Sequence, residues 1–492
     1  MGLSTQLSSV IVIMRQRYPF YYYLYLYLAL LLSIGGWYLV YTNTKMMKKY
    51  PTHYYFWLFL ALLLSILFWV VVLWKLPSRV GEYAPVVGFP TQRGQVHTLP
   101  DRYYRLRPID RERIIRDSIS HREIVSDLVN IAIKDTTYRT HEFVKDFEKK
   151  YDPAQYPFSY VDSTLNYMQV KVPEGKREGF KQEVKQQMGG YDLLVWDEAL
   201  FGKNDAKADA NHRAWQWENL YPLRSVEAQH LVVAVIDNGF DLMHPALQGK
   251  SIKPYNATND TADVRPAQEN HGTGVASLIM GTRFEDIEGL VPSCRLMPIK
   301  VADANDLMAS SYIVKGILYA IKNRADVVNL SLGANLQMLQ GMPEAYQQDY
   351  INEEGKDEEA FWKELFGYAQ QNKTMIVMAA GNDNMMTGFD PFQRATTTIK
   401  VGATTADGYK AVFSNYGAYT TLYAQGEELK VARPGGQSEV LQGTSFSAPI
   451  VCAFMIALKA KYPNYDSSQL REELLKNTEK KHNLIILHNK TF

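Results

Sequence analysis

The sequence has few cysteines and no excess of charge of either sign. Its two cysteines, Cys294 and Cys452, both lie among apolar neighbours. Two thiols cannot form a disulfide framework, so we interpret both as small buried side chains. Lysine and arginine number 53, against 52 aspartate and glutamate residues. Such a balanced chain has no overall field that would attract a polyanion, so no nucleic-acid partner is expected.

Two long uncharged runs lie near the N-terminus, in residues 20–41 and 54–74. Each is long enough to cross roughly 30 Å of hydrocarbon as a helix, and tyrosine and tryptophan gather at the ends, as in aromatic belts. The pattern predicts a transmembrane hairpin within residues 1–76, with membrane lipid as a partner. A cleaved signal peptide is the alternative for the first run, because Arg15 and Arg17 precede it. Its length and its many tyrosines oppose that reading.

Two spans place the rest of the chain on the same membrane face as Met1. The basic residues that flank the outer ends of the hairpin are Arg15, Arg17, Lys75, Arg79 and Arg93, and those of the connector, residues 42–53, are Lys45, Lys48 and Lys49. The positive-inside rule then favours the cytoplasmic face for the remainder of the protein.

A chain of 492 residues is too long for one core and is expected to form two or three units. Residues 77–158 begin as a Pro-, Gly- and Arg-rich juxtamembrane linker. Apolar residues at near-helical spacing then predict an amphipathic helix over residues 110–134. Packing is its simplest role, and binding of a regulatory partner or oligomerisation through residues 77–158 is the alternative.

A small α+β domain is predicted in residues 159–203. Residues 167–172 alternate like a strand, residues 175–188 have helical spacing, and residues 191–196 form a second strand after Gly189 and Gly190.

From Leu231 onward, short apolar runs alternate with helical segments; the runs are residues 231–236, 295–301, 327–330, 375–380 and 399–403. Strands buried on both faces have this composition, so residues 204–492 are predicted to form an open parallel sheet with helices on both sides. In such α/β sheets the functional residues gather beyond the carboxyl ends of the strands.

Three segments at such positions carry reactive side chains. The first run is followed by Asp237-Asn238-Gly239, and Asn270-His271-Gly272-Thr273-Gly274 opens a helix of small residues. Gly443-Thr444-Ser445-Phe446-Ser447-Ala448-Pro449 starts a second helix, which runs to about residue 461. Taken alone, the aspartate is a turn former, the histidine is structural and the serine is a helix cap.

Together the three segments resemble the subtilisin-like (subtilase, peptidase S8) protease family, whose triad occurs in the order Asp, His, Ser. The resemblance covers residues 231–477. It extends to secondary motifs, which are Gly289-Leu290-Val291-Pro292, Ile299-Lys300-Val301, Ala379-Ala380-Gly381-Asn382 and Phe413-Ser414-Asn415-Tyr416-Gly417.

The resemblance implies a serine endopeptidase that hydrolyses protein or peptide substrates through an acyl-enzyme. Ser445 would be the nucleophile, His271 the general base and acid, and Asp237 the residue that orients His271. Asn382 and the Ser445 amide would bind the oxyanion. Ser331, Leu332 and Gly333 resemble the strand that pairs with an extended substrate.

The resemblance also bears on control and location. Residues 159–203 match the family's inhibitory propeptide in length and position, with a generic accessory domain as the alternative. In that family the segment leaving the propeptide occupies the groove, which here corresponds to residues 197–203. Most such enzymes work outside the cell, which opposes the charge count around the hairpin.

Some residues depart from the family pattern. Asn238 stands where a small hydroxyl residue is common, and Gly274 where a second histidine is common. The acidic run at residues 353–359 either forms a solvated face or borders the groove and favours basic substrates. Phe389, Asp390 and Pro391 differ from the usual wall of the pocket for the P1 side chain. No calcium loop with clear ligand spacing is evident, so neither a metal nor another cofactor is expected.

A pseudoprotease is the alternative from another functional class. Such a protein would keep the fold as a membrane scaffold or peptide-binding module without cleaving. Intact Asp237, His271, Ser445 and Asn382 oppose it, because a non-catalytic binder gains nothing from keeping all four.

Overall fold

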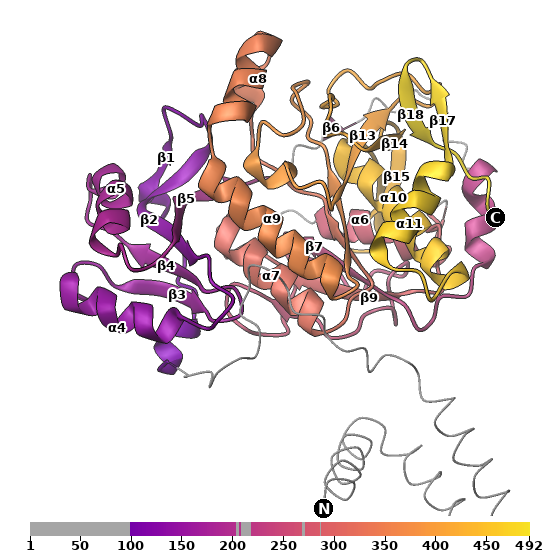
Figure 1. Ribbon diagram of the computed structural model, residues 1–492. Coiled ribbons are helices and arrows are strands. Elements are labelled where there is room, and N and C mark those ends of the chain that lie inside the picture. The colour runs from indigo at the N-terminus through magenta and orange to yellow at the C-terminus, as the bar shows by residue number, and fades with distance from the viewer. Residues whose placement is uncertain (1–98, 203–205, 208–217, 268–270, 286) are drawn as a thin grey trace, which may run out of the picture. The chain divides into compact units, whose positions relative to one another are not determined.

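The computed structural model describes residues 99–202, 206–207, 218–267, 271–285 and 287–492 (Figure 1). All of them belong to one of the two compact parts of the chain, Tyr83–Phe492. The predicted transmembrane hairpin, with its spans at residues 20–41 and 54–74, lies outside the described residues, as does most of the predicted linker.

A nine-stranded sheet forms the centre of the larger unit, in the order β17-β18-β14-β13-β12-β11-β7-β9-β8. The five predicted runs are its middle strands, which are β7 (Val232–Asp237), β9 (Arg295–Lys300), β11 (Val327–Leu330), β12 (Met375–Ala379) and β13 (Ile399–Thr404). These strands pair in parallel, which confirms the predicted open parallel sheet. The outer strands are β8 (Tyr255–Asn256), β14 (Leu422–Gln425), β17 (Thr478–Lys481) and β18 (Leu484–Leu487).

Helices cover both faces of this sheet, because successive residues of each strand point to opposite sides. Val233 and Val235 of β7 belong to one buried cluster with α6 (His271–Met280) and α10 (Thr444–Lys461). Ala234 and Ile236 belong to another, with α7 (Ser310–Lys322) and α9 (Lys356–Gln371). Both cysteines are buried as predicted.

Among the described residues, one helix, α10, is long and apolar enough to cross a membrane. Because 89% of its apolar window is buried inside the protein, we interpret it as a core helix.

A smaller α+β unit precedes this sheet. Its elements are β2 (Glu123–Ile133), α4 (Thr140–Lys150), β3 (Phe158–Asp162), β4 (Tyr167–Lys171), α5 (Arg177–Gln187) and β5 (Leu193–Phe201). The antiparallel order β5-β2-β4-β3 is that of a split βαβ (ferredoxin-like) unit. One face packs on α4 and α5, and the other packs on the larger unit, where Trp196 lies 4.6 Å from Phe361 of α9 between ring centroids.

The predicted helix over residues 110–134 is wrong. These residues form β1 (Ile114–Arg116) and β2, and the predicted boundary between residues 158 and 159 falls inside the unit. Strand β2 buries side chains on both faces, Val129 and Ile131 toward the helices and Ala132 toward the larger unit. A strand that is apolar on both faces lacks period-2 alternation, so its apolar positions matched a helical count equally well.

The remaining elements are short or peripheral. They are β6 (Ala206–Lys207), β10 (Met308–Ala309), β15 (Leu429–Arg433), β16 (Gln437–Gln442), α8 (Glu344–Glu353), α11 (Ser467–Lys476), and the 3-10 turns Asp101–Tyr104, Arg111–Arg113, Glu218–Ser225, Gln337–Leu339 and Pro391–Gln393.

Candidate active site

Asp237 and His271 form a buried pair where a strand ends and a helix begins. Asp237 is the last residue of β7 and His271 the first of α6. The His271 Nδ1 atom lies 2.8 Å from Oδ1 and 2.9 Å from Oδ2 of Asp237, and both residues are at most 2% exposed. A Cβ on Gly272 would lie 2.9 Å from the Asp237 Cβ, so only glycine lets the helix start this close to the strand.

The two departures from the family pattern near His271 have local explanations. Asn238 Oδ1 accepts a hydrogen bond from the His271 backbone N–H at 3.1 Å, so the amide side chain helps to hold the start of α6. Gly274 packs against β15, and a Cβ there would lie 3.0 Å from Val431 Cγ2. A second histidine at this position would require β15 to move.

Ser445 lies at the start of α10, as predicted, and is 3% exposed. Its Oγ donates to the carbonyl oxygen of Ser331 at 3.4 Å, while Ser331 Oγ donates to the carbonyl oxygen of Ser445 at 2.7 Å. The ring of Phe446, the next residue, lies 5.4 Å from the His271 ring between centroids. The packing therefore places the serine segment beside the imidazole.

Asn382 follows β12 and is oriented by the residue before Ser445. Its Oδ1 accepts from both the backbone N–H and the hydroxyl of Thr444, each at 2.8 Å. With the oxygen held in this way, the Nδ2 group faces the other side of the amide. Gly381 has φ +105°, and a Cβ there would lie 2.3 Å from Nδ2 of Asn415, which belongs to the predicted Phe413–Gly417 motif. Both secondary motifs thus serve to place Asn382.

Asp383, next to Asn382, is buried, and this burial raises the pKa of its carboxyl to about 7.

The segment predicted to bind substrate is already paired. Gly202, just after β5, donates its N–H to the Gly333 carbonyl at 2.8 Å and accepts from the Gly333 N–H at 3.2 Å. On its other edge β5 pairs with β10, where Phe201 lies opposite Met308 and Leu200 opposite Ala309. The end of β5 is thus the middle strand of three antiparallel segments. Strand β10 was missed, since two residues carry no periodic signal.

The chain pairs again a few residues later, with the strand that precedes Ser445. In the antiparallel pair of β6 with β16, Ala206 lies opposite Gln442 and Lys207 opposite Leu441. Gln442 is three residues before Ser445. The chain therefore pairs with the protein both before and after residues 203–205, which lie outside the described residues.

The residues expected to differ from the usual pocket wall are also placed. The Phe389 ring stacks on Tyr350 at 4.1 Å between centroids, and Pro391 begins a short 3-10 turn. Asp390 is buried and pairs with Arg122 of the α+β unit. Glu358 and Glu359 of the acidic run are buried as well, so this part of the run is not a solvated face.

A further acidic cluster lies within the α+β unit. Carboxylate oxygens of Asp117, Glu178 and Asp197 all lie within 4.8 Å of one another. Arg177 already pairs with all three, at 3.3, 2.7 and 3.2 Å. The negative charge of this cluster is thus already paired with a guanidinium.

The comparisons with known proteins agree with this architecture. The model of the subtilase family matches residues 228–490. A thermophilic serine proteinase of Bacillus sp. (strain AK1) is 30% identical over 234 residues, which cover 47% of this chain and 53% of that relative. Subtilisin NAT of Bacillus subtilis subsp. natto is 26% identical over 331 residues, which cover 65% of this chain and 76% of that protein.

Two solved structures share the fold. Fervidolysin from Fervidobacterium pennivorans, a keratinolytic enzyme related to subtilisin, has a TM-score of 0.58 at 17% identity, covering 82% of this chain and 64% of its own. A mutant of the epidermin leader peptide processing serine protease from Staphylococcus aureus has a TM-score of 0.57 at 17% identity, covering 72% of this chain and 94% of its own. Since the family model alone matches more than half of the residues, the chain belongs to the subtilase family, a family of serine endopeptidases.

Proposed function

We propose that the protein is a membrane-tethered serine endopeptidase with Asp237, His271 and Ser445 as its triad. Ser445 Oγ attacks the scissile carbonyl carbon while His271 Nε2 takes the hydroxyl proton, and the proton then passes to the leaving amine as the peptide C–N bond breaks. Water, deprotonated by the same imidazole, hydrolyses the acyl-enzyme. The observation that carries this proposal is the buried Asp237–His271 pair, because a carboxylate on Nδ1 fixes the tautomer that presents Nε2 as a base.

The groove geometry supports a latent enzyme. Residues 200–202 pair where an extended substrate would add as a strand, and residues 206–207 pair with β16, which ends three residues before Ser445. Glu198 strengthens the attachment, because its carboxylate accepts from Ser310 Oγ at 2.6 Å and from the Ser311 N–H at 3.1 Å at the start of α7. A tethered segment has an effective concentration of order mM, so even a weak inhibitor blocks the site.

Latency is tested in the full chain by a substitution that weakens the packing of the segment proposed to block the groove, residues 200–202 and 206–207. The Phe201 ring packs against Phe392 at 5.2 Å and Trp362 at 6.5 Å between centroids. Phe201→Ala is expected to increase both peptide hydrolysis and fluorophosphonate labelling of Ser445 at least tenfold, because truncating a buried phenylalanine costs about 3–5 kcal/mol. Ile119→Ala is the matched control: this apolar residue lies in the same unit but is 56% exposed.

The outcomes separate three explanations. Equal and fast labelling of wild type and Phe201→Ala means that the unit is a spacer rather than an inhibitor. If Ser445 is not labelled in either protein even after the α+β unit has been removed by limited proteolysis, the pseudoprotease alternative is correct.

The membrane tether rests on the two uncharged runs at residues 20–41 and 54–74. The charge count around them favours a cytoplasmic catalytic unit. We expect a single cysteine reporter in the connector, residues 42–53, to be labelled by an impermeant reagent in intact cells. A protected connector together with a labelled reporter just after Trp74 would place the catalytic unit on the opposite face, and a fully soluble chain would rule out the tether.

A further inference from the structure

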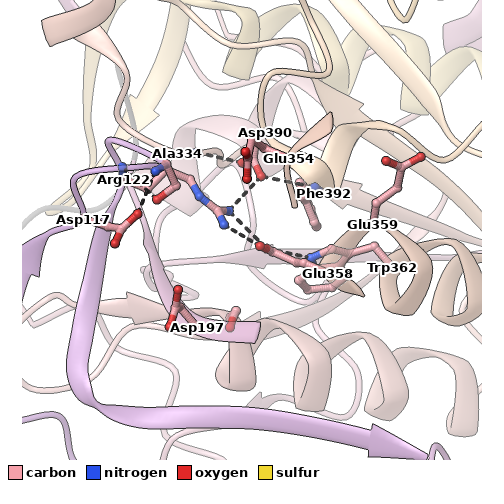
Figure 2. A network of polar contacts seen from close by, with 12 residues as sticks. Asp117, Arg122, Asp197, Ala334, Glu354, Glu358, Glu359, Trp362, Asp390 and Phe392 are labelled. Atoms are coloured by element: carbon pink, nitrogen blue, oxygen red, sulfur yellow. Dashed lines mark hydrogen bonds and ion pairs between the residues drawn. The ribbon is translucent and has the colours of Figure 1, made fainter. Parts of the chain in front are cut away.

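A buried arginine of the α+β unit is inserted into the larger unit. Arg122 directly precedes β2, and its side chain is 5% exposed. Its Nη1 atom lies 3.1 Å from Glu358 Oε1 and 3.1 Å from Asp390 Oδ1, and Nη2 also bonds to Glu358 Oε2 (Figure 2). The guanidinium therefore forms a two-pronged contact with Glu358 and bridges to Asp390, the geometry in which arginine binds carboxylates most specifically.

The carboxylates of Glu358 and Asp390 belong to the larger, catalytic unit. The other groups that donate hydrogen bonds to them are neutral. Glu358, on α9, also accepts from Trp362 Nε1 at 3.1 Å. Asp390 also accepts from the backbone N–H groups of Phe392 at 3.1 Å and Ala334 at 3.3 Å. The neighbouring Arg394 pairs with Glu359 instead. Among the described residues, Arg122 is thus the cation that compensates Glu358 and Asp390.

One of these carboxylates also holds the substrate-binding segment. Asp390 accepts from the Ala334 N–H, and Ala334 directly follows Gly333, which pairs with the blocking residue Gly202. In Figure 2, dashed lines join Asp390 to both Arg122 and Ala334. The contact with Arg122 and the groove thus share a single side chain.

Removing Arg122 from between Glu358 and Asp390 would be electrostatically unfavourable. Burial raises the pKa of Asp390, and the positive charge of Arg122 opposes that effect. Burial alone would lower the pKa of Arg122, but Glu358 and Asp390 outweigh it and raise this pKa. Without Arg122, two buried carboxylates would face each other with no counter-ion, which is the costly way to break a buried ion pair.

We propose that Glu358 and Asp390 form an arginine-binding socket of the catalytic unit, and that its occupation by Arg122 both locks the inhibitory unit in place and positions the Ser331–Ala334 segment. This inference rests on the proposed latency and names the residue that sustains it. Arg122 is a positioning residue that acts on the groove through Asp390.

The test uses the full chain in detergent and the rate at which a fluorophosphonate labels Ser445. Arg122→Ala is expected to raise this rate on the order of 100-fold, because removing one partner of a buried pair strongly destabilises the contact. Ser445 should also be labelled fast in Arg122→Lys, since an ammonium cannot form the two-pronged contact. Lys185→Ala is the matched control: Lys185 also pairs across the two units, with Asp357, but is 43% exposed, so its loss should change the rate by less than about fivefold.

Chemical rescue distinguishes a specific guanidinium-binding socket from a non-specific weakening of the contact between the α+β unit and the larger unit. Ethylguanidinium has the atoms that Arg122→Ala removes, so adding it should restore slow labelling, whereas the neutral analogue ethylurea should not. Equal effects of the two compounds would show that the socket has no specificity and would overturn the proposal. Slow labelling of Arg122→Ala alongside fast labelling of Phe201→Ala would also overturn it while leaving latency intact. Fast labelling of the wild type would instead refute latency itself.

Discussion

Ser445→Ala is expected to lower peptide hydrolysis by about 10⁶-fold, the size of effect seen when subtilisin loses its nucleophile. The Ser445 hydroxyl oxygen is the atom that forms the acyl bond in the proposed mechanism. The folded state should hardly change, because the bond from Ser445 Oγ to Ser331 is long, at 3.4 Å. Hydrolysis should be measured in the Phe201→Ala background, where the groove is expected to be open.

Ser447→Ala is the matched control for that experiment. Ser447 lies two residues further along α10 and is equally buried, but it has no role in the proposed mechanism. It should keep the turnover of the Phe201→Ala parent and show the same melting temperature as Ser445→Ala in that background. Turnover by Ser445→Ala that persists near the level of the parent variant would exclude Ser445 as the nucleophile.

Asn382→Ala is expected to reduce kcat by about 10²–10³ with little change in KM. In the proposed mechanism, the Nδ2 group of Asn382, whose Oδ1 atom accepts from Thr444, donates to the oxygen that becomes negative when Ser445 attacks. This donation is strongest in the transition state, which is why kcat should fall rather than affinity. Steady-state kinetics of a chromogenic peptide, again in the Phe201→Ala background, measure both constants.

Two further variants test whether the loss of kcat comes from the N–H group of the Asn382 side chain. Asn382→Asp keeps an oxygen for Thr444 but removes the N–H, so it should lose at least as much activity as Asn382→Ala. Asn323 donates to the Tyr319 carbonyl at the C-terminal end of α7. This end of α7 leads into the start of β11, whereas Asn382 follows the end of β12, so Asn323→Ala should leave kcat unchanged. An increase in KM alone for Asn382→Ala would mean that the side chain binds ground-state substrate instead of the oxyanion.

The parts of the site that follow regular elements could be predicted from the sequence. Asp237 ends a strand and both His271 and Ser445 begin helices, so motif and secondary structure pointed to the same positions. The five middle strands were predictable because each is a short apolar run buried on both faces.

The parts that depend on distant pairing could not be predicted. Strand β2 lacks alternation, because its two faces pack against different layers. Arg122 belongs to no motif and lies 236 residues from Glu358, so nothing local marks the contact. Strand β6 has two residues, and its place beside β16 follows from the tertiary fold alone.

The pairing of Gly202 with Gly333 has a consequence for substrate selectivity. Both residues lack a side chain, and a Cβ added to either would meet no atom within 4 Å. The groove therefore has room at this point for residues of many shapes, which the main chain alone would hold. One residue earlier the situation is reversed, because Phe201 lies against Phe392 and Trp362. If substrate takes the place of this segment, as the proposed latency requires, we expect the aromatic contact to favour an apolar side chain over a charged one, which would lose its hydration there.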